Sequence, residues 1–268
     1  VRQLMQALRY CRSLEVLRLG DNRIGLKGAV ALGEVLGRSD CLRSLELPNS
    51  HVGPGPMVVL GKALQSNRSL QKLNLYKNEI GLKGVTALGE ALRGKSFLQE
   101  LNLHHGHIGP EGAEVLGVAL QSNTSLRTLG LNFNDIDPKG AAALGEALCN
   151  NTYLQSLELN CNSIGPKGAI ALGEALLCNT ALHSLRLGEN EIGPEGTGPL
   201  AEALRNNAHL QRLDLHGNDI GPEATAKLQD ALQSNSTLQE LDLRDNCLNA
   251  EAVAKLREAA HTCSRFRA

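Results

Sequence analysis

Leucines recur along this chain of 268 residues at a fixed spacing of 28 residues. Within a repeat, further apolar residues stand at offsets four, six and eleven, counted from the first leucine as offset one. A constant period of this length is typical of a solenoid, in which copies of one structural unit stack on each other. The first leucines of the nine repeats are Leu14, Leu42, Leu70, Leu98, Leu126, Leu154, Leu182, Leu210 and Leu238.

Each repeat reads as a short strand, a turn and a helix. In the repeat that begins at Leu154, we expect Leu157, Leu159 and Ile164 to point into the core. The short apolar strand suits a parallel sheet, in which each strand reaches the next through a crossover helix. The sequence therefore predicts an α/β solenoid with a parallel sheet on one side and helices on the other.

Turns and helix ends carry small and polar residues at fixed offsets. Offset nine is Asn in seven of nine repeats, and its amide can satisfy backbone groups that lose ladder partners where the strand ends. Offset twelve is Gly in seven repeats and otherwise Asp137 or Asn249, which predicts a helix N-cap. An Asn at offset 26, such as Asn67, is expected to take the left-handed conformation of a helix C-cap.

The period predicts one domain over residues 1–268. Residues 1–13 fit the second half of a truncated repeat, so we expect the chain to be part of a longer protein and a monomer in this form. Nine repeats follow from Leu14, and residues 249–268 are expected to form a C-terminal cap, with Phe266 folding back as a plug.

The unit L-x-x-L-x-L-x-x-N-x-I-G-x-x-G-x-x-x-L-x-x-x-L resembles the leucine-rich repeat in its ribonuclease-inhibitor-like form. The resemblance covers nearly the whole chain and implies a horseshoe with strands on the concave face and helices on the convex face. The same curvature follows from spacing, because neighbouring strands lie about 4.8 Å apart whereas packed helices need about 8 to 10 Å.

Three relatives within that class differ in function. NOD-like receptors carry uniform 28-residue repeats at the C-terminal end of a longer chain, so this resemblance implies a cytoplasmic sensing or regulatory domain of innate immunity. A GTPase-activating protein of the Ran-cycle type is one alternative, although no acidic tail follows Cys263. A ribonuclease-inhibitor-like enzyme inhibitor is another, although those proteins alternate two repeat types.

Composition and motifs narrow the possible partners. Basic and acidic side chains, 27 and 28 in number, are interspersed, which disfavours nucleic acid and anionic membranes. No apolar run approaches the roughly 18 residues of a membrane span.

No nucleophile elbow or phosphate-binding loop is present, so we expect no enzyme activity, no catalytic residues and no cofactor. Seven cysteines without a C-x-x-C pair indicate free thiols in a reducing compartment.

The ligand, a protein or peptide, is expected on the concave face at offsets three, five, seven and eight, because strand side chains alternate. Tyr76, His104 and Phe133 come from three consecutive repeats and are expected to form one patch. Aromatic side chains at the centre of a groove are typical interface anchors. The candidate binding residues are Tyr76, Lys77, His104, His105, Asn132, Phe133, Asn160, Arg186, Glu189, Asp214, His216, Asp242 and Arg244.

Two further interpretations concern charge on this face. His104, His105 and His107 suggest a zinc site, but neither Cys nor Asp stands at a supporting spacing, so we expect no metal. In the C-terminal half, carboxylates outnumber arginines at these offsets, which would steer a basic partner. A solvated face of mixed charge is the alternative.

Overall fold

The computed structural model describes residues 13–94 and 96–268. Residues 1–12, most of the predicted half-repeat, lie outside this description. Backbone contacts divide the chain into two compact units, residues 1–134 (unit 1) and 135–268 (unit 2). A single domain and a horseshoe curvature stay predictions.

Strands and helices alternate along both units. Unit 1 contains β1 (Val16–Arg18), α2 (Gly25–Arg38), β2 (Ser44–Glu46), α3 (Pro54–Ser66), β3 (Lys72–Asn74), α4 (Gly81–Arg93), β4 (Glu100–Asn102), α5 (Gly109–Ser122) and β5 (Thr128–Gly130). Unit 2 contains α6 (Pro138–Asn150), β6 (Ser156–Glu158), α7 (Gly165–Cys178), β7 (Ser184–Arg186), α8 (Gly193–Asn206), β8 (Arg212–Asp214), α9 (Thr225–Ser234), β9 (Glu240–Asp242), α10 (Ala250–Ala259) and β10 (Arg265–Arg267).

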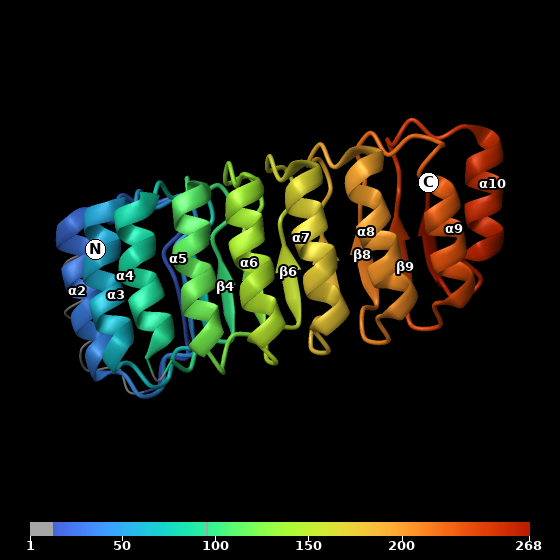
Figure 1. The fold of residues 1–268 in the computed structure, drawn as a ribbon. Coiled ribbons are helices and arrows are strands. Elements are labelled where there is room, and N and C mark those ends of the chain that lie inside the picture. The colour runs from blue at the N-terminus through green and yellow to red at the C-terminus, as the bar shows by residue number, and fades with distance from the viewer. Residues whose placement is uncertain (1–12, 95) are drawn as a thin grey trace. The chain divides into compact units, whose positions relative to one another are not determined.

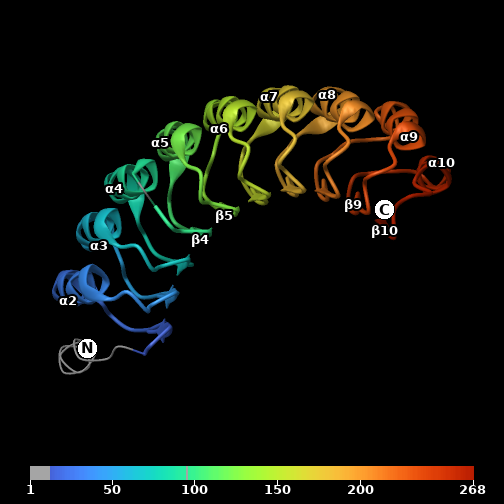
Figure 2. The same cartoon turned by 90° about the horizontal axis from the view of Figure 1, so that it is seen from below.

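Within each unit the strands pair in parallel and in chain order. The leucine at offset four keeps the register, since Leu17 lies opposite Leu45 and Leu185 lies opposite Leu213. In each unit the helices lie on one side of the strands and leave the other side uncovered (Figure 1, Figure 2). The predicted α/β arrangement of parallel strands and helices is confirmed.

The core of each unit consists of the apolar residues of the repeat pattern. In unit 2, Leu154, Leu159 and Ile164 are fully buried, as their offsets predict. Helix glycines permit close packing, because a Cβ added at Gly61 would lie only 2.8 Å from the carbonyl oxygen of Ala87 on the next helix. An alanine there would push α3 and α4 apart.

The asparagine at offset nine forms the predicted ladder. Asn190 is buried, and its Nδ2 donates to the carbonyl oxygens of Leu159 at 2.9 Å and Leu187 at 3.0 Å. The backbone N–H of Asn190 in turn donates to Oδ1 of Asn218 at 3.0 Å. Where Ser50 replaces the asparagine, its hydroxyl donates to the carbonyl oxygen of Leu19 at 3.0 Å. The ladder therefore satisfies backbone groups that the turn leaves without strand partners.

The asparagine at offset 26 does not have the predicted left-handed conformation. Asn207 is extended, with φ −83°, and its side chain is buried. Its Nδ2 donates to the carbonyl oxygen of Leu176 at 2.7 Å, and its Oδ1 accepts from the backbone N–H of Leu210 at 2.8 Å. The prediction was wrong because these amides are selected for side-chain hydrogen bonds between repeats, which form a second ladder.

The predicted N-cap at offset twelve is confirmed in three of the described repeats, at Gly53, Asp137 and Asn249. Asp137 accepts from the backbone N–H groups of Lys139 and Gly140, both at 2.9 Å, and Asn249 accepts from that of Ala252 at 2.8 Å. Gly81, at the start of α4, instead has φ +60°. Glycine is used there for a left-handed turn, which costs it little.

Candidate functional site

The uncovered side of the strands, called here the strand face, carries the side chains at offsets three, five, seven and eight. In every repeat the residue at offset eight has a left-handed backbone, with φ between 48° and 62°. The turn is held by a backbone bond to the next repeat, for example from the N–H of Lys77 to the carbonyl oxygen of His104 at 2.9 Å. Offset eight therefore lies in a left-handed turn of fixed geometry in every repeat.

Not every residue at offset eight is of a type that tolerates a left-handed backbone. Asp21, Asn49, Gly217 and Asp245 are residues that tolerate the left-handed conformation. Five consecutive repeats between them carry residues for which the conformation is unfavourable by about 1 to 2 kcal/mol: Lys77, His105, Phe133, Cys161 and Glu189. Strain of this kind clusters at functional sites, so these side chains are candidates for binding.

In unit 1, three rings on the strand face are in contact, and we call Tyr76, His105 and Phe133 the aromatic patch. The rings of His105 and Phe133 stack with centroids 4.1 Å apart and planes 9° apart. The Tyr76 ring meets His105 edge-on, with centroids 5.6 Å apart. Phe133 is 47% exposed, and the ammonium of Lys77 lies 5.2 Å from the centre of the Tyr76 ring. The patch is thus apolar, accessible and bordered by a positive charge.

The histidine between the two aromatic rings is His105, whereas the sequence predicted His104. The ring of His104 packs against the backbone of β5, where a Cβ added at Gly130 would lie 2.6 Å from its Cε1. Its Nδ1 accepts from the backbone N–H of Asn132 at 2.8 Å. His104 and Asn132 therefore support the strand beneath the patch. The left-handed turn at offset eight places the side chain of His105 beside the rings of Tyr76 and Phe133.

Burial lowers the pKa of His105, and the nearby charges of Lys77, His104 and His107 lower it further. The imidazole is therefore neutral near pH 7 and stacks on Phe133 as an uncharged ring. A neutral ring costs little to cover with an apolar ligand group, whereas an imidazolium would resist desolvation.

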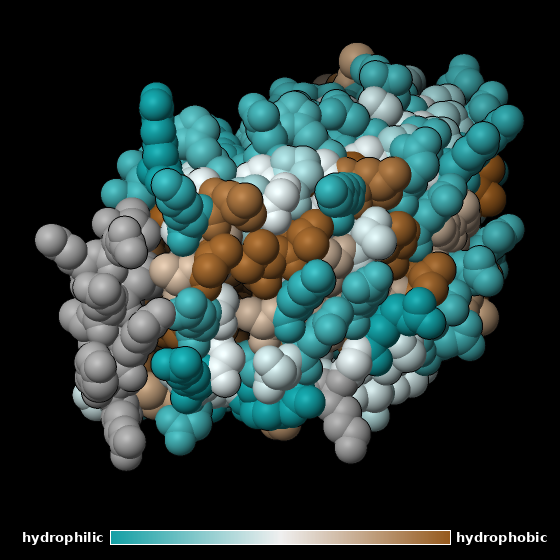
Figure 3. Space-filling view, turned by 90° about the vertical axis from the view of Figure 1, so that its left-hand side faces the viewer, coloured by the Kyte–Doolittle hydropathy of each residue, from teal (hydrophilic) through white to brown (hydrophobic). Residues whose placement is uncertain are grey.

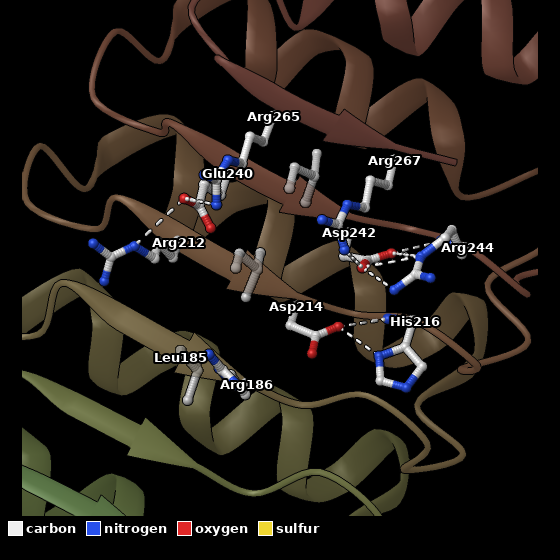
Figure 4. A pocket seen from close by; sticks show the side chains of 12 residues that line it. Leu185, Arg186, Arg212, Asp214, His216, Glu240, Asp242, Arg244, Arg265 and Arg267 are labelled. Carbon is white, nitrogen blue, oxygen red and sulfur yellow. Dashed lines mark hydrogen bonds and ion pairs between the residues drawn. The ribbon is translucent and has the colours of Figure 1, made fainter.

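In unit 2 the strand face forms a hollow of about 260 Å³, which we call the charged hollow (Figure 4). Its floor includes leucines of β7, β8 and β9. The charged and polar residues that line it are Arg186, Arg212, Asp214, His216, Glu240, Asp242, Arg244, Arg265 and Arg267.

Each of the two carboxylates of β9 contacts two arginines. Burial alone would raise the pKa of Asp242, but hydrogen bonds from Arg244 and its charge lower it, so this carboxylate is ionised. The ion pairs are Glu240 with Arg212 at 3.8 Å and with Arg265 at 3.3 Å, and Asp242 with Arg244 at 2.6 Å and with Arg267 at 3.7 Å.

His216 lies within a network of carboxylates at the edge of the hollow. Its Nδ1 is 2.7 Å from Oδ1 of Asp214, and its Nε2 is 3.4 Å from Oε1 of Glu189. The other oxygen of Asp214 accepts from Nδ2 of Asn160 at 3.0 Å. Burial opposes the charged form, but the hydrogen bond to Asp214 and its charge, the hydrogen bond to Glu189 and the charge of Asp242 raise the pKa of His216 overall.

The expected excess of carboxylates does not apply to the charged hollow, where five arginines face three carboxylates. The difference comes from β10, which adds Arg265 and Arg267 beside β9. Phe266 lies opposite Leu241 as part of this strand, half-buried. The sequence offered one signal, the polar-apolar-polar alternation of residues 265–267, but this strand follows β9 at a spacing of 25 residues and so falls outside the 28-residue period.

Cys161 contacts one of these networks, because its Sγ lies 3.5 Å from Oε2 of Glu189. Burial and the hydrogen bond to Glu189 raise its pKa to about 11, so the thiol is protonated near neutral pH and is a poor nucleophile. Across residues 13–94 and 96–268, no three His, Cys, Asp or Glu side chains are placed to hold a metal ion. In the same residues no helix is long and apolar enough to cross a membrane.

Apolar residues are also exposed outside the strand face. Leu26 and Val30 on α2 are 57% and 46% exposed. Figure 3 shows hydrophobic residues gathered on the side at which unit 1 begins. Leu26 and Val30 belong to a helix, so they do not extend the aromatic patch.

A family model for the leucine-rich repeat matches the chain in eight segments: residues 10–33, 66–89, 94–117, 122–145, 150–173, 178–201, 206–228 and 234–256. The chain belongs to the leucine-rich repeat family. Residues 34–65 are unmatched, and they contain Ser50 in place of the ladder asparagine.

Two solved structures are similar to parts of this chain. The actin-binding site 2 of leiomodin-1 is 24% identical with a TM-score of 0.48, over 56% of this chain and 86% of that one. The tropomodulin C-terminal domain of Caenorhabditis elegans is 16% identical with a TM-score of 0.48, over 66% and 92%. A comparison with curated proteins finds no match.

Proposed function

We propose that this chain is a non-enzymatic binding module that holds a protein or peptide segment on its strand face, with the aromatic patch as the anchor. The observation that carries the proposal is the exposure of Phe133 from a left-handed backbone, stacked on a neutral His105. A bulky aromatic residue in that conformation lowers stability, which indicates a role other than folding.

The chemistry of the patch suits a peptide side chain. Aromatic rings bury a large area while few rotors are frozen, so they are common anchors of interfaces. Lys77 beside Tyr76 can pair with a carboxylate or a carbonyl oxygen at the edge of a bound segment. We expect an apolar or aromatic ligand residue against Phe133, with polar contacts around it.

The uniform 28-residue repeats support a sensing or regulatory role of the NOD-like-receptor type in the cytoplasm. The other candidate binding residues, including Asn160, Arg186 and Glu189, would then recognise further parts of the ligand. The Ran-cycle activator remains the alternative class. It predicts that the added chain speeds GTP hydrolysis by a small GTPase, whereas a receptor-type module leaves that rate unchanged.

The test compares Phe133→Ala with Phe97→Ala. Phe97 is a matched control, because it is 48% exposed in unit 1 but lies in the loop before β4. Proteins captured from a cytosolic extract by wild type are identified, and their affinity is measured for both variants. Phe133→Ala should weaken binding at least about fivefold, the result of losing roughly 1 kcal/mol of interface energy, while Phe97→Ala should not. Equal binding by both variants would exclude the aromatic patch.

A further inference from the structure

We infer that the charged hollow of unit 2 is a second binding site, and that it takes a short acidic peptide segment. The site is separate from the aromatic patch and does not depend on the function proposed for it. Its lining holds five arginines against three carboxylates, a formal excess of two positive charges with His216 neutral. The chain as a whole has a formal charge of −1, so the positive charge is local to the hollow.

Arginine side chains keep hydrogen-bonding capacity after their ion pairs are formed. Glu240 is shared by Arg212 and Arg265, so one carboxylate faces two guanidinium groups. Asp242 is shared in the same way by two arginines. A guanidinium has five N–H donors in a planar fork, and one shared carboxylate cannot engage them all. Added carboxylates would complete these pairs.

The side chain of Arg186 makes no hydrogen bond or ion pair within the described part of the chain, and it is exposed at the rim of the hollow. Its guanidinium can therefore bind a ligand without breaking an existing contact. Glu158 is its neighbour in register on β6, outside the residues that line the hollow. Among the residues that line the hollow, arginines therefore outnumber carboxylates over β7 to β10.

The remaining carboxylate of the hollow does not oppose an anion strongly. Asp214 is occupied by His216 and by the amide of Asn160, and Glu189 contacts the opposite nitrogen of the same imidazole. Protonation of His216, which these carboxylates favour, would neutralise part of their charge. The arginines around β9 therefore dominate the field that a ligand meets.

The dimensions of the hollow indicate the length of the segment. Neighbouring strands lie about 4.8 Å apart, so the three intervals from β7 to β10 span roughly 14 Å. An extended peptide advances about 3.3 Å per residue, so four or five residues cross the hollow. Carboxylates match the guanidinium fork in bidentate geometry, which favours Asp or Glu side chains. Hexaglutamate is long enough to fill the site and diglutamate is not.

Fluorescence anisotropy with the full chain tests this inference. Fluorescein-labelled hexaglutamate should bind, labelled hexalysine should not, and labelled diglutamate should bind at least tenfold more weakly than hexaglutamate. Arg186→Gln should weaken hexaglutamate binding roughly tenfold, the effect of losing one charge-assisted hydrogen bond without breaking an ion pair. Arg205→Gln is the matched control, because it removes the same charge from the exposed last turn of α8.

Equal weakening by Arg186→Gln and Arg205→Gln would overturn the site, because it would show attraction by overall charge only. Inorganic phosphate that displaces hexaglutamate at equal molar concentration would overturn the peptide ligand in favour of a simple anion site. Arg265→Gln supplies a second variant and should also weaken binding. Phe133→Ala should leave hexaglutamate binding unchanged, so failure of this inference is distinguishable from failure of the aromatic patch.

Discussion

The aromatic patch of unit 1 and the charged hollow of unit 2 lie on the same type of surface, yet they place a histidine in opposite environments. His105 stacks on a ring, and burial and neighbouring positive charges lower its pKa. His216 is also opposed by burial, but Asp214 and Glu189 raise its pKa overall. The repeat supplies the same strand and turn in both cases, so the difference lies entirely in the side chains at the variable offsets.

This comparison separates what the repeat fixes from what it leaves open. The buried leucines, the asparagine ladders and the left-handed turn at offset eight recur in both units. Chemistry on the strand face can therefore change from apolar to charged within a few repeats without altering the backbone. Each surface can be altered by mutation separately from the other.

The largest expected effect on stability comes from the core leucines, which occupy equivalent positions in the two units. Leu75→Ala in unit 1 and Leu159→Ala in unit 2 empty equivalent, fully buried sites. Each should lower the free energy of unfolding by about 2 to 5 kcal/mol, as the contacts of a buried leucine are lost. Denaturant titration followed by circular dichroism measures both. An unchanged midpoint for either variant would contradict the equivalence of the two cores.

The next effect concerns the support beneath each histidine. A Cβ added at Gly188 would overlap the ring of His216, and one added at Gly130 would meet that of His104. Gly188→Ala should displace His216 from Asp214 and cost about 1 to 3 kcal/mol through overpacking. The pKa of His216 should then fall toward its ordinary value, which proton NMR titration detects. A raised pKa that survives in Gly188→Ala would show that Asp214 is not its cause.

Strain at Phe133 should be measurable by comparing two substitutions. Phe133→Asn and Phe133→Ala both remove the stack on His105, but asparagine tolerates the left-handed turn better. Phe133→Asn should therefore be more stable than Phe133→Ala by roughly 1 kcal/mol. Equal unfolding midpoints would mean that the turn stores no strain at this position.

The smallest effect is the opposite pH dependence of the two histidines. His216, with a raised pKa in the folded state, stabilises fully below its unfolded value of about 6.5, and this contribution is lost as pH rises through the folded pKa. His105, with a lowered pKa, costs stability as pH falls below about 6.5.

Replacing each histidine by Gln isolates these contributions. Relative to wild type, His216→Gln should be destabilised most at acidic pH, where the stabilising contribution of His216 is fully present. Any destabilisation of His105→Gln relative to wild type should be smaller at acidic pH, because His105 itself costs the wild type stability there. Unfolding midpoints at pH 5 and pH 8 supply the measurement. The same pH profile for both variants would remove the contrast between the two surfaces.

The period sufficed to predict the fold because it repeats one set of physical requirements. Leu159 and Ile164 follow from apolar spacing, and Asn190 follows from the need to satisfy a turn. The role of Asn207 was misassigned, because asparagine serves both left-handed caps and side-chain ladders. The absence of glycine at that offset from all nine repeats was the signal that the amide, and not the backbone conformation, is required.

The surfaces were harder to predict because they depend on contacts between repeats. His104 and His105 are adjacent in sequence, and only the left-handed turn shows which of them reaches Phe133. Arg265 and Arg267 lie on a strand outside the period. Both cases involve a departure from regular strand alternation or spacing, which a repeat pattern does not encode.

The two asparagine ladders also limit how such a chain can change its length. Asn190 and Asn207 each donate to a carbonyl oxygen 31 residues earlier in the sequence. Each of these hydrogen bonds therefore requires a separation of one repeat plus three residues. Removing or adding 28 residues within the array would restore every one of these distances, whereas a change of one residue would misalign both ladders at once. Growth and loss are therefore permitted in whole repeats, and single-residue insertions are confined to turns that carry neither amide.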